Sequence, residues 1–383
     1  MPFLDIERIE VLKGPQSIMF GKNSVAGALN LSSAKPTEDT EAHVGLQYQP
    51  AIGATELTAM LSGSLTETLS ARIALRDYNE DGYIDNSYKQ RDETQREESA
   101  MRLSVLWEPN DDMNFLFKIE RDEFEGTGRQ IEVIRDDPAL LGAPIPGANY
   151  AQILTMLGHP NAITDDELNY ERQADAEESN TNALNNATLT ANFNLGDYTL
   201  TSVSGFVSYD FVETCDCDYT AAPVFSVFID EEYEQFSQEV RIVSPVGEKF
   251  DWLAGLFYQT SELGFDDDIK IPENSVLSLV SGGVLSQLNG QGAGRNYQLD
   301  TDMWSVFFQG RYHVTDALTL TLGGRYSSET KTSSRVMNIT DLSTCLLYPS
   351  DAADELHCVA LCGRRIFKEK RLLSVLWTIL IAH

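Results

Sequence analysis

The sequence has no hydrophobic run long enough to cross a membrane as a helix. Its longest apolar run, LLSVLWTILIA at 372–382, falls short of the roughly 20 residues that a membrane helix needs. The opening residues, MPFLDIERIEVLKG, have neither the basic start nor the apolar stretch of a signal peptide. These features exclude a helical membrane protein. They leave open a membrane protein made of alternating strands, which hydropathy averages do not detect.

Basic residues are also scarce, since 28 Lys and Arg stand against 59 Asp and Glu and the formal net charge is −31. No nucleic-acid partner is expected, because phosphate binding needs a basic surface. The acidity alone indicates a solvated surface and names no substrate. His43, His159 and His313 lie far apart in the sequence and form no Ser-His-acid arrangement, so we expect no catalytic residues and no enzyme.

The chain has only five cysteines, and two of them, Cys215 and Cys217, flank Asp216 on a predicted long loop. Two cysteines separated by a single residue rarely pair without strain, so two free thiols or a disulfide to a loop missing from this sequence is favoured. A metal contact with Asp216 and Asp218 is disfavoured because four ligands are not visible. The acidic run at 265–270 is interpreted as a solvated loop tip rather than a calcium site. No metal site is predicted.

From about residue 42 onward, apolar and polar residues alternate with the period of a β-strand. In MNFLFKIE, Met113, Phe115, Phe117 and Ile119 share one face, and Asn114, Leu116, Lys118 and Glu120 share the other. Similar alternation occurs in residues 68–77, 101–108, 304–309 and 317–323. Such strands fit a soluble sandwich with its apolar face inward or a membrane barrel with its apolar face outward.

The connections between these strands favour the barrel. Short links with turn residues lie near 65–68, 109–112, 195–197, 246–249 and 314–317, and they alternate with long polar links at about 78–97, 122–182, 212–232 and 262–299. Short turns at one rim and long loops at the other are typical of outer-membrane barrels. A loop of about 60 residues is uncommon in a compact soluble domain.

We predict about eleven strands between residues 42 and 332, all antiparallel. Large plugged barrels close at 22 strands. An open sheet in lipid would leave two edges of unpaired backbone groups, so the chain is expected to form part of a larger barrel. The predicted fold class is all-β, a partial transmembrane β-barrel.

Residues 5–36 read DIERIEVLKGPQSIMFGKNSVAGALNLSSAKP. They predict a strand, a tight turn at Gly14-Pro15, a short amphipathic piece and a second strand. Glycines supply tight turns or close backbone approach. Pro15 fits a strand end because it cannot donate to a ladder.

This segment resembles the closing part of the plug domain of TonB-dependent outer-membrane receptors, through its IERIEVLKGP run, its FG step and its GALNL strand. Residues 236–258 (FSQEVRIVSPVGEKFDWLAGLFY) and 317–331 (ALTLTLGGRYSSETK) resemble the barrel of the same family. The resemblance spans about residues 5–335. It implies the end of a plug at 1–36 and the N-terminal half of the barrel at 37–344.

The resemblance implies active import across the outer membrane of a Gram-negative bacterium, with no cofactor and no covalent chemistry on the substrate. The implied partners are the TonB energy-transducing complex, outer-membrane lipid and a small-molecule or metal-chelate substrate, most often a ferric siderophore. The TonB-coupling motif and the signal peptide are expected in the full-length parent. A vitamin B12 or oligosaccharide importer and a passive porin-like barrel are the alternatives. The acidic loops do not favour an anionic ferric siderophore, so the substrate stays open.

The resemblance also carries the candidate site residues. The plug-motif positions are Arg8, Glu10, Lys13, Gly14, Pro15, Gly21, Gly27 and Asn30. In this family, basic plug residues pair with carboxylates on the barrel wall. Lys13 stands where the family usually has Arg, so the bidentate contact that an arginine makes is lost there. Glu239 is the candidate wall carboxylate for this plug–barrel lock, on the inner face if Val240 and Ile242 face lipid. The alternative that Glu239 is an ordinary charge on the inner wall is favoured at least as much.

The barrel pattern stops after about Thr344. Residues 345–355, CLLYPSDAADE, closely resemble the translation of a sequencing-library adaptor, and 359–367 resemble its distal part. We predict that 345–383 is a non-native tail. A short amphipathic helix and a zinc site are the weaker alternatives; the zinc ligands would be Cys345, His357, Cys358 and Cys362, but their spacing gives no paired knuckles.

Overall fold

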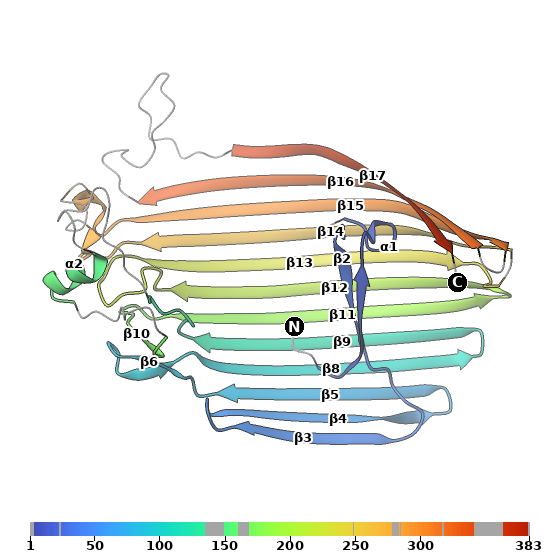
Figure 1. The fold of residues 1–383 in the computed structure, drawn as a ribbon, viewed down its shortest axis with the longest axis horizontal. Helices are drawn as coiled ribbons and strands as arrows, with labels where there is room; N and C mark the ends of the chain where they lie inside the picture. Colours follow the sequence, from blue (N-terminus) through green and yellow to red (C-terminus); the bar gives the residue numbers. More distant parts are fainter. Residues whose placement is uncertain are drawn as a thin grey trace.

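A computed structural model describes residues 4–22, 24–134, 149–159, 168–247, 249–277, 283, 285–315, 318–340 and 363–381. Within them the chain forms two main bodies, a small hairpin and a large antiparallel sheet (Figure 1). Among the described residues, no helix is both long and apolar enough to cross a membrane.

The hairpin contains the segment that resembles a plug. Strand β1 (Ile6–Lys13) pairs antiparallel with β2 (Gly27–Ser33), and the single turn α1 (Ser17–Phe20) lies between them. This is the predicted order of strand, turn, short amphipathic piece and strand. The hairpin lies in front of the large sheet and runs across its strands (Figure 1), so we call the sheet face that it covers the inner face.

The large sheet has twelve strands within the described residues, paired in sequence order apart from the small strands of the loops. They are β3 (Glu41–Gln49), β4 (Ala54–Thr66), β5 (Leu69–Glu80), β8 (Gln95–Asn110), β9 (Met113–Thr127), β11 (Ser179–Leu195), β12 (Tyr198–Cys215), β13 (Ser226–Val243), β14 (Phe250–Lys270), β15 (Gly292–Thr315), β16 (Leu318–Thr340) and β17 (Gly363–Ile381). Eleven of them lie between Glu41 and Thr340, the number that the alternation predicts. The sheet does not close.

The strands are longer than the alternation predicts, and several predicted ends were wrong. The acidic run at 265–270 is not a loop tip, because it lies inside β14, where Asp267 pairs with Arg295 of β15. Alternation is lost there because both faces are polar, yet backbone pairing continues. Strand β17 pairs with β16 in the part of the chain predicted as a tail, so 363–381 is a strand rather than the alternative helix. The four candidate zinc ligands lie outside the described residues.

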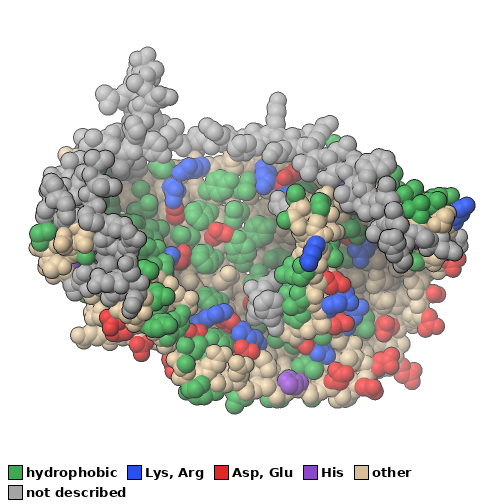
Figure 2. Space-filling model, in the orientation of Figure 1, with side chains coloured by type: hydrophobic (Ala, Val, Ile, Leu, Met, Phe, Trp, Pro, Cys, Tyr) green, Lys and Arg blue, Asp and Glu red, His purple; other side chains and the backbone are tan. Residues whose placement is uncertain are grey.

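The large sheet buries polar side chains and exposes apolar ones. Along β15, Trp304, Val306 and Phe308 are 43–48% exposed, whereas the alternating residues Ser305 and Phe307 are each 1% exposed. On the inner face the buried groups include Arg72, Arg102, Glu120 and Arg325, and Figure 2 shows charged side chains along the hollowed face beside the hairpin. This polarity excludes a second sheet packed on the apolar rows and matches a barrel wall that faces lipid.

The long loops gather at one rim of the sheet (Figure 1), which we call the long-loop rim. They contain β6 (Ile84–Asn86), β7 (Arg91–Glu93), β10 (Glu171–Arg172), α2 (Tyr150–Met156) and the short 3-10 helix η1 (Ser286–Leu288). Three loops share a small apolar core of Leu154, Ala222, Val224 and Val276. The rim is therefore a folded layer of its own.

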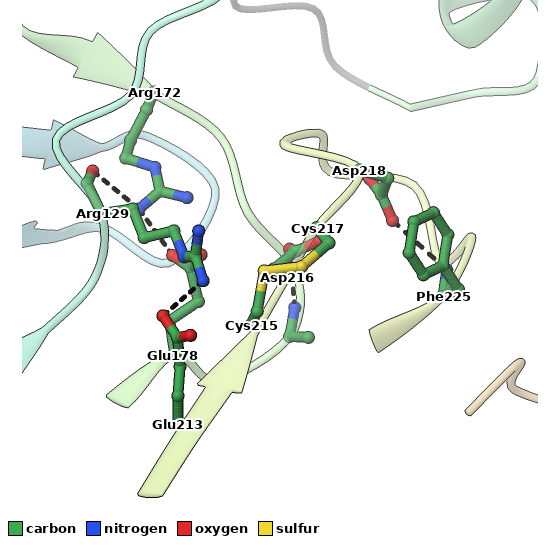
Figure 3. Close-up of a disulfide and its surroundings, with 10 residues drawn as sticks. Arg129, Arg172, Glu178, Glu213, Cys215, Asp216, Cys217, Asp218 and Phe225 are labelled. Carbon is green, nitrogen blue, oxygen red and sulfur yellow. Dashed lines mark hydrogen bonds and ion pairs between the residues drawn. A yellow bond between two sulfur atoms is a disulfide. The ribbon is translucent and has the colours of Figure 1, made fainter. Parts of the chain in front are cut away.

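The disulfide prediction was wrong. Cys215 and Cys217 are bonded to each other, with their Cα atoms 5.2 Å apart (Figure 3), a separation within the usual range for a disulfide. Cys215 ends β12, and the chain turns sharply there so that the two side chains meet. Asp216 between them is fully buried.

Candidate plug–barrel interface

One end of the hairpin is fixed to the inner face by an ion pair. Arg72 on β5 donates from Nε and Nη2 to the two carboxylate oxygens of Asp5, at 2.7 and 2.6 Å. Both side chains are largely buried. A bidentate pair fixes direction as well as distance, so Asp5 holds the start of β1 against the wall.

The residue before Asp5 makes a second contact with the same wall. Leu4 is buried against Ala74 and Ala100, and its carbonyl accepts a hydrogen bond from Arg102 Nη1 at 2.5 Å. Arg102 also donates to Glu120 at 2.5 Å. The wall arginine is thus neutralised by a wall carboxylate while it still binds the plug backbone.

The other end of the hairpin rests on Arg325 of β16. Its guanidinium donates to the carbonyls of Ile18 and Met19, at 3.3 and 3.5 Å. These carbonyls belong to the short turn α1, which leaves them without partners in the turn itself. Arg325 also lies 5.2 Å from the ring centroid of Phe307, a cation–π geometry that holds the guanidinium in place.

Two further contacts complete this end. Lys22 forms an ion pair with Glu329 of β16. Ile18 is buried in the space above Gly323, where an added Cβ would lie 2.5 Å from Ile18 Cδ1. The glycine in the GGRY stretch of β16 therefore makes room for the plug side chain.

The plug-motif glycines occupy three different settings. Gly14 has φ +80° and opens the turn after β1, and Pro15 follows it. Gly27 has φ +148°, and a Cβ there would lie 2.3 Å from the Leu12 carbonyl oxygen. Gly21 has φ +72°, and a Cβ there would lie 3.3 Å from the Arg325 guanidinium, so this position combines the turn with close approach to the wall.

Among the predicted charged plug residues, Arg8 and Glu10 contact each other rather than the wall. Arg8 pairs with Glu10 at 3.1 Å on the hairpin surface. Asn30, opposite Glu10 in the register, donates to its carboxylate at 2.7 Å. Lys13 is exposed, and no ion pair of Lys13 occurs within the described residues. The contacts of Glu10 with Arg8 and Asn30 stabilise the hairpin itself.

Glu239 lies on β13 opposite Phe257, whose ring centroid is 5.5 Å from the Arg325 guanidinium carbon. Its ion pair is with Arg241, at 3.1 Å. Within the part of the chain that the structure describes, Glu239 is not in an ion pair with Arg8 or Lys13. The role of Glu239 in a plug–barrel lock therefore stays a proposal.

Sequence reasoning missed the residues that join hairpin and wall, namely Asp5, Lys22, Arg72, Arg102, Arg325 and Glu329. A signal was present for two of them, because an arginine on the polar face of a membrane strand needs a partner inside the barrel. Arg72 and Arg102 both alternate with apolar residues. Nothing in the sequence indicated that Arg72 would bind the carboxylate of Asp5 or that Arg102 would bind the backbone carbonyl of Leu4.

The rim also contains perturbed carboxylates. Burial raises the pKa of Asp216 to about 8, and the nearby charge of Asp218 adds to the effect. Burial also raises the pKa of Asp218. Both groups lie beyond the end of β12, outside the lipid-facing part of the wall.

The family model described as "TonB dependent receptor-like, beta-barrel" matches residues 127–345, which is more than half of the chain. This chain belongs to the TonB-dependent receptor family. The family and its structural neighbours are transport receptors and not enzymes, in agreement with the expectation from the sequence.

Curated relatives align over a shorter stretch. The ferrioxamine receptor of Yersinia enterocolitica is 27% identical over 113 residues, which make up 30% of this chain and 15% of that receptor. The ferrichrome outer membrane transporter and phage receptor of Escherichia coli K12 is 28% identical over 113 residues, 29% of this chain and 14% of that protein.

Solved structures match the fold of almost the whole chain. The ferric yersiniabactin uptake receptor of Yersinia pestis has a TM-score of 0.69 at 13% identity and covers 98% of this chain. The ferripyoverdine receptor of the Pseudomonas aeruginosa outer membrane has a TM-score of 0.60 at 14% identity and covers 87%. This chain covers 49% and 46% of those structures, so it spans about half their length.

Proposed function

We propose that the receptor represented by this chain imports an iron chelate across the outer membrane of a Gram-negative bacterium, driven by the TonB complex. A ferric siderophore is the proposed substrate class. The names of the two curated relatives, which refer to ferrioxamine and ferrichrome, support an iron chelate over vitamin B12 or an oligosaccharide.

The observation that carries this proposal is the hairpin seated on the inner face. A passive pore needs an open lumen, whereas here Asp5 and the α1 turn are bound to wall arginines across the sheet. A lumen obstructed in this way conducts only if the obstruction moves. Movement against several charged contacts requires work, which supports an energised transporter over a passive porin.

The test is uptake by the full-length receptor in a host stripped of its own iron-chelate receptors. Radioactive iron is supplied as ferrioxamine or as ferrichrome, in cells with and without TonB. We expect uptake of at least one chelate that disappears without TonB. Uptake that persists without TonB would indicate a passive pore, and uptake of cobalamin or an oligosaccharide in place of iron would favour the alternatives. Siderophore, cobalamin or glycan genes beside the complete gene would provide an independent check.

We also propose that 1–36 is the end of the plug, 37–344 is barrel and 345–383 is non-native. The boundary near 36 is supported by the gap between the end of β2 at Ser33 and the start of β3 at Glu41. An open sheet edge accepts any strand that can pair with it, which accounts for β17 without requiring a native origin. The DNA decides the last point, since native sequence continuing through residue 345 without adaptor identity would rule the idea out.

A further inference from the structure

Three carboxylates of the long-loop rim meet in one place. Asp175 precedes β11, and Asp216 and Asp218 follow β12. One oxygen from each of the three lies within 4.8 Å of the others. We propose that this trio binds a hard divalent cation, Ca²⁺ in preference to Mg²⁺. The proposal is independent of what the receptor transports.

The carboxylate of Asp216 provides the first argument. Asp216 is fully buried, and its Oδ2 accepts a hydrogen bond from the Ala176 N–H at 3.2 Å. Its Oδ1 is buried and has no hydrogen-bond partner. A buried carboxylate oxygen without a donor is costly, and here it belongs to a group that shares its space with two other carboxylates. A cation at their centre would satisfy it.

The charge balance provides the second argument. Among the described residues, no ion pair includes any member of the trio. Of the nearby arginines, Arg172 pairs with Glu93 and Glu178, and Arg129 pairs with Glu213 (Figure 3). The remaining Nε and Nη2 of Arg172 make no hydrogen bond to the trio. The three carboxylates therefore meet without a protein cation in an ion pair, and buried carboxylates are normally hydrogen-bonded, paired or bound to a metal.

The loop is also held in place before any cation arrives. The Cys215–Cys217 disulfide spans Asp216. Asp218 Oδ1 accepts from Thr220 N at 3.1 Å and from Thr220 Oγ1 at 2.6 Å, and Asp175 N donates to the Thr220 carbonyl at 3.2 Å. Because these contacts fix the chain, less ordering is required when the ion binds.

The chemistry of the donors selects the ion. Carboxylate oxygens favour hard cations over zinc or copper, and both neighbouring sulfurs are tied up in the disulfide. Calcium lies about 2.3–2.6 Å from its ligands, so oxygens up to roughly 5 Å apart can share one ion. An irregular loop suits the flexible coordination of Ca²⁺ better than the strict octahedron of Mg²⁺.

Equilibrium dialysis of the full chain in detergent with radioactive Ca²⁺ tests the proposal, beside Tb³⁺ luminescence sensitised by tyrosine. Tyr219, next to Asp218, is a suitable sensitiser. We expect one saturable site with a Kd of roughly 10⁻⁴–10⁻³ M, as in extracellular calcium modules, and weaker competition by Mg²⁺. Absence of saturable binding in the millimolar range would overturn the proposal.

Asp175→Asn is the main variant because Asp175 is only half-buried, and Asp216→Asn is the second. Each is expected to weaken Ca²⁺ binding roughly tenfold or more, because a charged ligand is lost. The matched control is Asp266→Asn, which removes the same charge from β14 at the same rim. Equal loss in the control would show a general charge effect and would contradict the site.

Hydrogen exchange of the rim amides gives a readout that does not depend on ion binding by the variants. In the original chain, Ca²⁺ should slow exchange near residues 175–178 and 216–225. Without Ca²⁺, Asp216→Asn should exchange more slowly than the original chain, because the buried carboxylate oxygen without a hydrogen-bond partner is removed. The opposite outcome is faster exchange in Asp216→Asn together with no effect of Ca²⁺ on the original chain. It would show that the Asp216 carboxylate only stabilises the loop, and it would refute the cation site.

Discussion

The strand wall and the long-loop rim bury opposite kinds of side chain. In the wall, Ser305 and Arg325 are buried while Trp304 and Val306 are exposed. In the rim, Leu154 and its apolar neighbours are buried, as in an ordinary soluble domain. The difference follows from the surroundings, because lipid gives no reason to hide apolar groups and water does. The same chain therefore buries polar side chains along the strands and apolar side chains in the loops beyond the strand ends.

Buried arginines do similar work in both regions. Arg172 joins β10 to Glu93 and Glu178 from neighbouring loop segments, and Arg72 joins the wall to Asp5 of the hairpin. In each case the guanidinium connects segments that are far apart in the sequence. Loss of one partner is expected to cost more than loss of an exposed pair, because the remaining charge stays buried.

The largest effect is expected where hairpin and wall meet. Asp5→Asn leaves the buried Arg72 guanidinium with only its longer contact to Glu41, at 3.7 Å, which should weaken hairpin docking by about 2–4 kcal/mol. Hydrogen exchange of the β1 and β2 amides measures this change. Glu7→Gln, at an exposed position on the same strand, is the control. If both variants exchange alike, the Asp5–Arg72 pair does not anchor the hairpin.

The rim should respond as a soluble core does. Leu154→Ala is expected to destabilise the loop layer by about 2–5 kcal/mol, through lost burial and a cavity, with little change in the strands. The readout is exchange of the Val276 amide, which donates to the Pro223 carbonyl at 3.0 Å. Met156→Ala on the same helix turn is the control, since Met156 is exposed. Uniform destabilisation of the strands would remove the distinction between rim and wall.

The wall should respond in the opposite sense to added charge. Val306→Lys places a charge on the lipid face of β15 and should cost about 2–4 kcal/mol near the bilayer midplane. Urea unfolding of the chain in lipid vesicles measures it. Val246→Lys makes the same replacement in an exposed turn and should have little effect. A harmless Val306→Lys would mean that this face does not contact lipid.

The smallest effect is expected on the hairpin surface. Glu10→Gln removes the exposed pair with Arg8, and such pairs contribute less than about 1 kcal/mol. Exchange of the β1 amides should change little compared with Asp5→Asn. A large loss would instead indicate that Glu10 contacts the barrel in the assembled receptor.

Much of the fold was predictable because alternation and loop length are local properties. The order of elements in residues 5–36 and the eleven strands up to Thr340 follow from them. Strand ends were less predictable, as the acidic run at 265–270 shows. Apolar and polar residues alternate along a strand only where its two faces have different surroundings. The alternation disappears where both faces of a paired strand are polar, as at 265–270.

The site was less predictable than the fold. The motif residues Gly14, Gly21 and Gly27 could be located because their backbone conformations demand glycine. The partners of the charged plug residues could not, because a charge in a sequence has many potential partners and only packing selects one. Glu239 was chosen for its face alone, and its ion-pair partner proved to be its neighbour Arg241.

The sequence by itself determined an antiparallel strand wall with short turns at one rim and long loops at the other, because period, turn residues and length are written along the chain. Tertiary structure alone decided which arginines hold the hairpin, that Cys215 bonds Cys217, and that Asp175 meets Asp216 and Asp218. Apart from the disulfide, which spans a single residue, those contacts join residues from separate strands and loops. Their distances depend on how the backbone brings the segments together, and no local pattern encodes them.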